Sequence, residues 1–248
     1  MIQVKAAIAE PVIGNVDLER IAATMEHAMP KQPAENAEKT APVRIPPAGL
    51  DGLVELPARP RGLVLFAHGS GSSRLSPRNQ FVAAALRKEG FGTLLFDLLT
   101  EDEAADRANV FDIPLLGERL LDATRWAAED PITASLPRAY FGASTGAAAA
   151  LVAAAELGAG VRAVVSRGGR PDLAGPSLSR VLAPTLLIVG GDDREVITLN
   201  RAALRQLHCE AKLEIVPGAG HLFEEPGTLE TVVGLAANWF RAHVHRKA

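Results

Sequence analysis

The sequence is poor in cysteine and in aromatic side chains. Cys209 is the single cysteine among 248 residues, which excludes an internal disulfide framework and any metal cluster held by several cysteines. Aromatic residues make up only 4% of the chain, so we expect an aliphatic core. No uncharged apolar run reaches the roughly 18 residues that a membrane-spanning helix needs. Any chemistry must therefore rest on a small number of polar residues.

Neither sign of charge dominates. The chain has 26 Lys and Arg against 29 Asp and Glu, a net charge of −3, which argues against an extended basic face for nucleic acid. Hydrophobic residues make up 48% and charged residues 22%, a composition typical of a folded chain. The first residues include Glu10 and Pro11 and lack a basic n-region, unlike a secretory signal. We expect a soluble, cytoplasmic protein with neither a nucleic-acid nor a membrane partner.

Residues 1–41 differ from the rest of the chain. Apolar residues recur at helical spacing between Asn15 and Met29, which predicts a short amphipathic helix. Pro30–Ala41 is polar and contains prolines, a pattern typical of a linker. This extension could pack on the remainder of the chain or on a second copy in a homodimer, or it could have no fixed structure. The sequence leaves these alternatives open, and we place the main domain at 42–248.

From Val43 onward, short apolar runs alternate with helical patterns, which predicts a mostly parallel sheet with helices on both faces. The expected strands are Leu53–Leu56, Gly62–His68, Thr93–Leu98, Arg138–Phe141, Arg162–Ser166, Thr185–Val189 and Leu213–Val216. The expected helices are Pro77–Glu89, Gly117–Glu129, Thr145–Leu157, Val196–Leu207 and Thr228–Ala242. The charged segment Glu101–Asn109 is interpreted as a solvated loop. Ligands of such sheets bind beyond the C-terminal strand ends, so functional residues are sought in the loops there.

A nucleophile candidate follows one of these strands directly. Gly142-Ala143-Ser144-Thr145-Gly146 has the G-x-S-x-G pattern between a strand and a helix, where a tight turn pushes the serine hydroxyl out above the sheet. The flanking glycines avoid collisions that a Cβ would cause. The alternative is an ordinary glycine-rich turn, which we consider less favoured in this setting.

A serine nucleophile needs a base and a carboxylate that orients the base. Of six histidines, His221 alone lies in a loop after a late strand, although it could instead cap the following helix. Asp192 and Asp193 follow the strand before it. We favour Asp193, because Asp192 could cap the next helix; Asp172 is a weaker third candidate. The order Ser144, Asp193, His221 is the order expected for this architecture.

The loop after the strand Gly62–His68 is the expected source of a second oxyanion donor. Backbone N–H groups of Thr145 and Ser70 would stabilise the oxyanion, and Gly69 and Gly71 would contact substrate. The segment lacks the Gly-Lys-Ser/Thr ending of a phosphate-binding loop. We interpret His68 as structural, holding this loop in place.

Four segments together resemble the α/β-hydrolase superfamily, and within it the dienelactone hydrolase-like family. They are HGSGSS, GASTG, GGDD and GAGHLFEEPG, and the resemblance runs from about residue 43 to the end. It implies a three-layer α/β-hydrolase sandwich. Dienelactone hydrolases proper use a cysteine nucleophile, whereas this motif carries Ser144, so the lactone substrate is not transferred. Some relatives are joined to phosphoribosyltransferases, but the first forty residues contain no phosphoribosyl-binding loop.

The same comparison bounds the substrate. Many members insert a lid after the sixth strand, but here only the fourteen residues Arg170–Ala183 are available, too few for a cap domain. We expect an open cleft for small or accessible esters. Arg167, at a strand end, could face this cleft and attract an anionic substrate; the alternative is that it pairs with a nearby carboxylate.

These residues predict a serine hydrolase that cleaves carboxylic esters through an acyl-enzyme. Ser144 attacks, His221 removes its proton, and Asp193 orients the imidazole. This chemistry requires no metal and no organic cofactor, and its partner is a small-molecule ester. Two alternatives remain: an acyltransferase with the same triad, and a non-catalytic binding module on a retained hydrolase fold.

Overall fold

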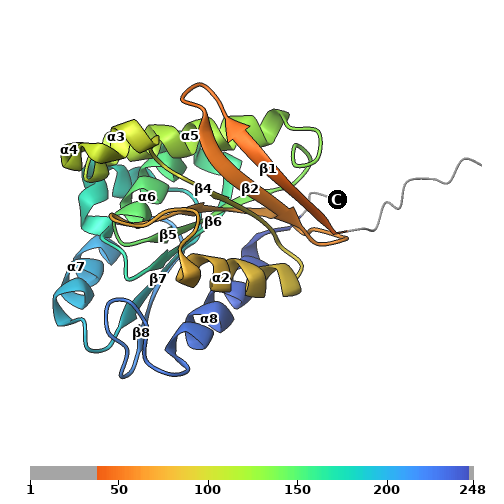
Figure 1. The fold of residues 1–248 in the computed structure, drawn as a ribbon. Helices are drawn as coiled ribbons and strands as arrows, with labels where there is room; N and C mark the ends of the chain where they lie inside the picture. The colour runs from red at the N-terminus through yellow and green to blue at the C-terminus, as the bar shows by residue number, and fades with distance from the viewer. Residues whose placement is uncertain (1–37, 246–248) are drawn as a thin grey trace, which may run out of the picture. The chain divides into compact units, whose positions relative to one another are not determined.

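The apolar runs of the sequence form the centre of an eight-stranded sheet (Figure 1). The computed structural model describes residues 38–245, so the helix expected within Asn15–Met29 lies outside the described residues. The strands are β1 (Lys39–Ile45), β2 (Leu50–Leu56), β3 (Leu63–Ala67), β4 (Gly92–Phe96), β5 (Arg138–Ala143), β6 (Val161–Arg167), β7 (Thr185–Gly190) and β8 (Ala211–Val216).

The strand order is β1-β2-β4-β3-β5-β6-β7-β8. Strands β4, β3 and β5 to β8 pair in parallel, whereas β1 and β2 are antiparallel. All residues of β3, β4 and β7 are buried, as expected for parallel strands covered on both faces. The expected mostly parallel α/β sheet is therefore confirmed, and all seven expected strands are present.

Strand β1 was not expected from the sequence. It begins at Lys39, inside the segment interpreted as a linker and before the domain boundary placed at 42, so the linker prediction is wrong from that residue onward. Ala41, Val43 and Ile45 face inward to different degrees, while Pro42 and Arg44 are exposed. A polar edge strand that contains proline resembles a loop in sequence. Its pairing with β2 identifies it as a strand.

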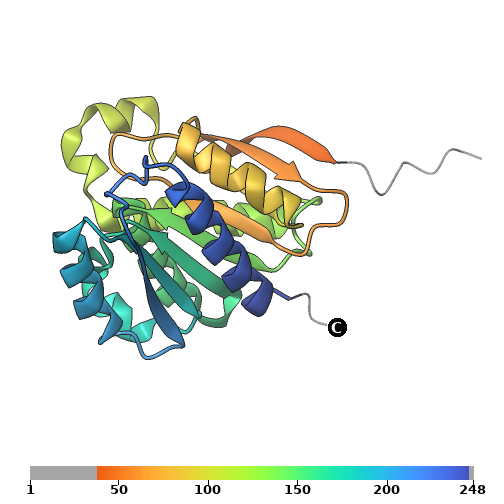
Figure 2. The same cartoon turned by 90° about the horizontal axis from the view of Figure 1, so that it is seen from below.

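Helices cover both faces of the sheet, and Figures 1 and 2 show the two layers from different sides. Apolar residues of α5 (Ile113–Glu129) and α6 (Thr145–Leu157) belong to one core cluster. Apolar residues of α2 (Pro77–Lys88) and α8 (Thr228–His243) belong to the cluster on the other face. Helix α7 (Arg194–Leu204) completes the five helices expected from the sequence. The three-layer sandwich is thus confirmed.

The segment Glu101–Asn109 is not a loop, which corrects the sequence interpretation. It forms α3 (Glu101–Ala105) and α4 (Arg107–Val110). The Thr100 hydroxyl accepts from the Glu103 N–H, and the Glu103 carboxylate accepts from the Thr100 N–H, a capping box that starts a helix. Neither helix buries a residue, which is why the amphipathic pattern of a longer helix is missing.

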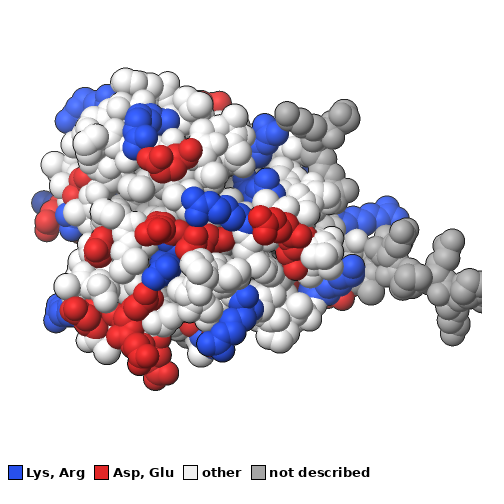
Figure 3. Space-filling model, turned by 90° about the horizontal axis from the view of Figure 1, so that it is seen from above, with Lys and Arg blue, Asp and Glu red and all other residues white. Residues whose placement is uncertain are grey.

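The segments between β6 and β7 are short. A 3₁₀ segment, η2 (Pro171–Arg180), follows Arg170, and no cap domain is inserted there. No helix within residues 38–245 is long and apolar enough to cross a membrane. Figure 3 views the molecule from the side of α3 and α5, and lysine and arginine side chains are interspersed there with aspartate and glutamate.

The turn from β5 into α6 leaves no room for a side chain at two of its positions. A Cβ at Gly142 would lie 2.5 Å from the Ala147 Cα, and one at Gly146 would lie 2.1 Å from the Ala67 carbonyl oxygen. Both neighbours are backbone atoms, which cannot turn aside as a side chain would. Glycine at these two positions lets α6 pack against the ends of β3 and β5, and this places Ser144 between them.

We expect Gly146→Ala to lower the free energy of unfolding by at least about 2 kcal/mol, because the added methyl overpacks a rigid backbone contact. The matched control is Gly234→Ala in α8, where an added Cβ meets nothing within 4 Å. That change should stabilise the protein by about 0.5–1 kcal/mol, the helix propensity difference. Urea unfolding of both variants measures this, and equal effects would contradict the packing account.

Candidate active site

Ser144 lies at the C-terminal end of β5 in a left-handed backbone conformation, with φ of +50°. Such a φ strains a residue that has a Cβ. Backbone hydrogen bonds hold it in place: its N–H donates to the Arg167 carbonyl at 3.3 Å, and its carbonyl accepts from the N–H groups of Ala147 and Arg170 at 3.1 and 3.0 Å. The strained serine expected from the G-x-S-x-G pattern is therefore present.

His221 and Asp193 meet at the same edge of the sheet, from the loops after β8 and β7. The Asp193 Oδ2 lies 2.6 Å from the His221 Nδ1, so this carboxylate can fix the ring with Nε2 directed elsewhere. His221 is 41% exposed and Asp193 15%. The ring lies beside Gly168, where an added Cβ would be 3.7 Å from the His221 Cε1. Gly168 follows Arg167, whose carbonyl binds the Ser144 N–H.

The other two carboxylates considered from the sequence lie elsewhere. Asp192 is exposed, and its side chain makes no hydrogen bond or ion pair among residues 38–245. It does not cap α7, because Asp193 is the N-cap residue there. Asp172 forms a two-point contact with the Arg170 guanidinium at 2.9 and 2.8 Å. Of the three, Asp193 alone contacts His221.

Several contacts that the sequence did not indicate hold the His221 loop. Phe223 is buried and has a φ of +56°, so its side chain anchors the loop in the core against backbone strain. Arg78 at the start of α2 pairs with Glu224 at 2.8 Å. The Glu225 Oε1 accepts from the Gly220 N–H at 3.1 Å. The sequence signal for these contacts is the HLFEEPG segment itself, since its phenylalanine and two glutamates supply them.

The loop after β3 packs directly against Ser144. A Cβ at Gly69 would lie 2.9 Å from the Ser144 Cβ and 3.6 Å from its Oγ, so only glycine fits there. The Ser70 N–H donates to the Thr145 Oγ1 at 3.0 Å. The structure thus brings Ser70 and Thr145 together as expected, but it also occupies the Ser70 N–H with the threonine hydroxyl. As the first residue of α6, Thr145 has no intrahelical acceptor for its own N–H.

His68 fastens this loop to the end of β4, in agreement with its expected structural role. Its Nε2 accepts from the Leu98 N–H and its Nδ1–H donates to the Gly69 carbonyl, both at 3.0 Å. Burial lowers the pKa of His68, although the Gly69 carbonyl and the Asp97 charge act in the opposite direction. The ring is therefore neutral at pH 7, which matches one donating and one accepting nitrogen.

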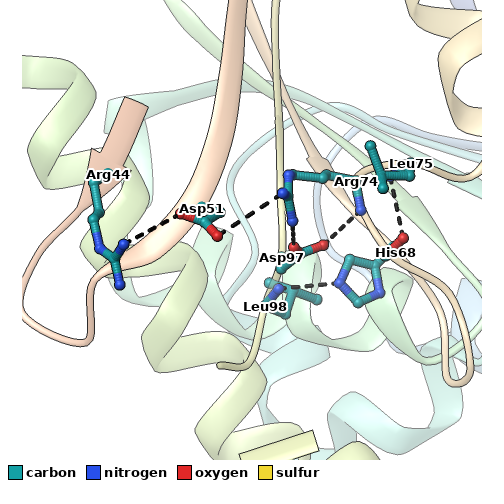
Figure 4. A network of polar contacts seen from close by, with 8 residues as sticks. Arg44, Asp51, His68, Arg74, Leu75, Asp97 and Leu98 are labelled. Carbon is teal, nitrogen blue, oxygen red and sulfur yellow. Dashed lines mark hydrogen bonds and ion pairs between the residues drawn. The ribbon is translucent and has the colours of Figure 1, made fainter. Parts of the chain in front are cut away.

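A polar network continues from this loop to the β1–β2 turn (Figure 4). The Arg74 N–H donates to the Asp97 Oδ1 at 2.7 Å, and the Arg74 guanidinium pairs with the same carboxylate. Arg74 also lies 3.8 Å from Asp51, which lies 3.8 Å from Arg44. Each carboxylate of this network thus faces a guanidinium, and the loop that borders Ser144 is held on both sides.

A cavity of about 770 Å³ opens beside this loop. Gly69, Ser70 and Gly71 line it on one side together with Thr145. The β1–β2 turn, the segment after β4 and helices α3 to α5 supply the rest of its wall. Gly69 and Gly71, which we expect to contact substrate, therefore border a cavity close to Ser144.

Arg167 lies at the end of β6 with only 7% of its surface exposed. Its Nη2 lies 3.4 Å from the Asn79 Oδ1, while Nε and Nη1 are buried without a partner among the described residues. The alternative that it pairs with a carboxylate is therefore wrong. Burial and the neighbouring Arg78 cation lower the pKa of its guanidinium to about 10, so it is charged at pH 7. Burial leaves little of it to touch a substrate.

Solved structures of other proteins share this fold, and one of them is also similar to this chain in sequence. No protein-family model matches the chain. A dienelactone hydrolase from Anabaena variabilis is 52% identical, with a TM-score of 0.80 over 84% of this chain and 99% of that one. A Xanthomonas campestris α/β serine hydrolase without a lid has a TM-score of 0.66 at 22% identity, over 86% and 97% of the two chains, which supports the fold alone.

Two curated relatives are similar to this chain in sequence but are named as transferases and not as hydrolases. Two Mycobacterium tuberculosis proteins named "Putative phosphoribosyl transferase" are 62% identical over 198 residues, which is 80% of this chain. The chain spans only 45% of their length. The transferase activity in the names of those longer proteins is therefore not assigned to this chain.

Proposed function

Because the chain belongs to the dienelactone hydrolase family of α/β-hydrolases, we propose that it is a serine hydrolase that cleaves carboxylic esters. The observation that carries this proposal is the 2.6 Å contact between Asp193 and His221, at the same sheet edge as the strained Ser144. A carboxylate on one imidazole nitrogen leaves the other free to accept a proton from a serine hydroxyl. The 52% identical relative is itself named a dienelactone hydrolase.

In the proposed mechanism, Ser144 Oγ attacks the ester carbonyl carbon while His221 Nε2 takes the hydroxyl proton. The tetrahedral intermediate collapses when His221 gives that proton to the leaving alkoxide, and the alcohol departs. Water then attacks the acyl carbon while His221 Nε2 takes its proton, and this proton passes to Ser144 Oγ as the carboxylic acid leaves. Within residues 38–245, Ser144 Oγ makes no hydrogen bond, and such bonds commonly tighten only when substrate is present. These steps involve only the protein, the ester and water.

We assign the oxyanion to backbone donors on both sides of Ser144. The Thr145 N–H lies at the start of α6, where the helix dipole adds a positive potential. The second donor is the Ser70 N–H, which becomes available when the Thr145 hydroxyl turns to another rotamer. The buried Arg167 cation contributes positive potential near the nucleophile, so its role here is electrostatic.

The two adjacent aspartates allow a matched test of the orienting carboxylate. Asp193→Asn should lower kcat for a p-nitrophenyl ester by about 10²–10⁴-fold, because an amide cannot stabilise the imidazolium and favours the wrong tautomer. Asp192→Asn, one residue earlier and without contact to His221, should change kcat less than about twofold. Steady-state kinetics of both variants test this prediction. An equal loss of kcat in both would show that Asp193 is not the orienting carboxylate.

Removing the nucleophile tests the proposed activity itself. Ser144→Ala should reduce kcat for p-nitrophenyl acetate by about 10⁴-fold or more, since a triad without its nucleophile loses nearly all its advantage. Alanine also keeps the small side chain next to Gly69, so the fold should be retained. The rate is measured together with the urea midpoint. A folded variant with wild-type turnover would refute the serine mechanism.

A further inference from the structure

The cavity of about 770 Å³ is lined by neighbours of Ser144 but not by Ser144 itself. Its wall includes Gly69 and Thr145, both adjacent to the nucleophile, but neither Asp193 nor His221. In an ester that is positioned for attack by Ser144, the carbonyl oxygen lies against the Thr145 N–H. The acyl chain and the alcohol part then extend from the carbonyl carbon in different directions. Because Gly69 and Thr145 line the cavity and His221 does not, we infer that one direction leads into the cavity and the other toward the His221 loop.

The mechanism decides which substituent occupies which side. The leaving oxygen must receive its proton from His221 Nε2, so the alcohol part of the ester lies on the His221 side. The acyl part then points away from His221, toward the oxyanion loop and the cavity behind it. The volume lies within the range of pockets for whole small ligands, so it exceeds what an acetyl group needs.

Apolar residues contribute to the lining of this cavity. Ala48 and Val110 are half-buried there and Leu99 is 8% exposed, with Leu50, Leu98 and Leu116 buried behind them. One wall is the network of Arg44, Asp51, Arg74 and Asp97 (Figure 4), in which every charge faces an opposite charge. An aliphatic acyl stem can therefore contact Ala48, Leu99 and Val110, while the charged wall offers hydrogen bonds and no uncompensated positive charge.

The part of the cavity lining that comes from α3 is acidic. Glu101 and Asp102 line the cavity from the first turn of α3, and neither forms an ion pair within residues 38–245. In total the lining contains four carboxylates and two guanidiniums, and the guanidiniums are already engaged with Asp51 and Asp97. A carboxylate on the acyl chain would meet unpaired negative charge, whereas an ammonium would be attracted.

We propose that this cavity is the acyl pocket, and that it selects acyl groups of medium length with an aliphatic stem and a cationic or uncharged end over those ending in a carboxylate. The proposal rests on the esterase function proposed above. It names the substrate class of that site, and it assigns Glu101 and Asp102 as the residues that determine charge preference.

Three p-nitrophenyl esters with acyl chains of equal length test the charge preference: 6-aminohexanoate, hexanoate and the adipate monoester. In the wild-type protein at low ionic strength, we expect kcat/KM for the ammonium ester to exceed that for the carboxylate ester by at least about tenfold. The difference should shrink in about 0.5 M salt, because exposed charges are screened. Equal rates, or faster turnover of the adipate ester, would overturn the proposal.

Charge variants identify the residues responsible. The double variant Glu101→Gln/Asp102→Asn should reduce the ratio of ammonium to carboxylate ester to about one to two, because the unpaired charge on α3 is gone. The matched control Glu129→Gln/Glu230→Gln also removes two exposed helix carboxylates, but neither lines the cavity. It should leave the ratio unchanged within about twofold. A similar fall in both double variants would indicate net charge and overturn the assignment to Glu101 and Asp102.

A size variant tests whether the acyl chain enters this cavity. Ala104 is an exposed cavity residue on α3, so Ala104→Trp should fill space without disturbing the core. We expect the ratio of hexanoate to acetate turnover to fall at least about fivefold. Ala128→Trp, at the far end of α5, should leave it unchanged. An unchanged ratio in Ala104→Trp would contradict the acyl pocket, whereas a wild-type protein that hydrolyses no ester would overturn the esterase function and the pocket together.

Discussion

The left-handed backbone at Ser144 is the constraint on which the rest of the site depends. A serine at φ of +50° costs of order 1–3 kcal/mol, and it persists only because its neighbours leave no other conformation. Three backbone hydrogen bonds fix its N–H and carbonyl, and Gly142 and Gly146 let α6 approach closely. The packing of α6 on the sheet therefore supplies the energy that holds the hydroxyl out above the strand ends.

The remaining functional groups reach this point from three separate loops. Parallel strands end at one edge of the sheet, so the loops after β3, β7 and β8 lie at the same edge as Ser144. A different interaction holds each loop. His68 accepts a hydrogen bond from Leu98 and holds the loop after β3. Asp193 is the N-cap residue of α7, and the buried Phe223 anchors the loop after β8. The rigid scaffold thus sets the geometry, while the short connection after β6 leaves the site without a cap domain.

Sequence patterns predicted the parts of the structure that repeat or that follow a motif. Continuous apolar runs indicated the buried strands, and the G-x-S-x-G spacing indicated Ser144 and the turn around it. Sequence patterns failed for elements that are defined by strand pairing at the sheet edge or that lie on the exposed surface. The strand β1 lacks an apolar pattern because it lies at an edge, and α3 and α4 bury nothing.

Contacts between distant residues also escaped prediction, for a physical reason. Nothing in the sequence states that Arg78 reaches Glu224, or that Arg167 lies buried beside Asn79 without a carboxylate. The choice between Asp192 and Asp193 rested on turn chemistry, and only the fold places one of them on His221. The cavity beside Gly69 is likewise formed by segments from five parts of the chain, so no local pattern encodes it.

The most direct test of the central claim is covalent labelling by a fluorophosphonate, which reacts only with a serine activated as a nucleophile. Peptide mass spectrometry of the labelled protein locates the modified residue. The account predicts one adduct per chain, on Ser144, and none after the protein is unfolded before labelling. A folded protein that takes up no label, or that is labelled on Ser70, Ser72 or Ser73 instead, would contradict it.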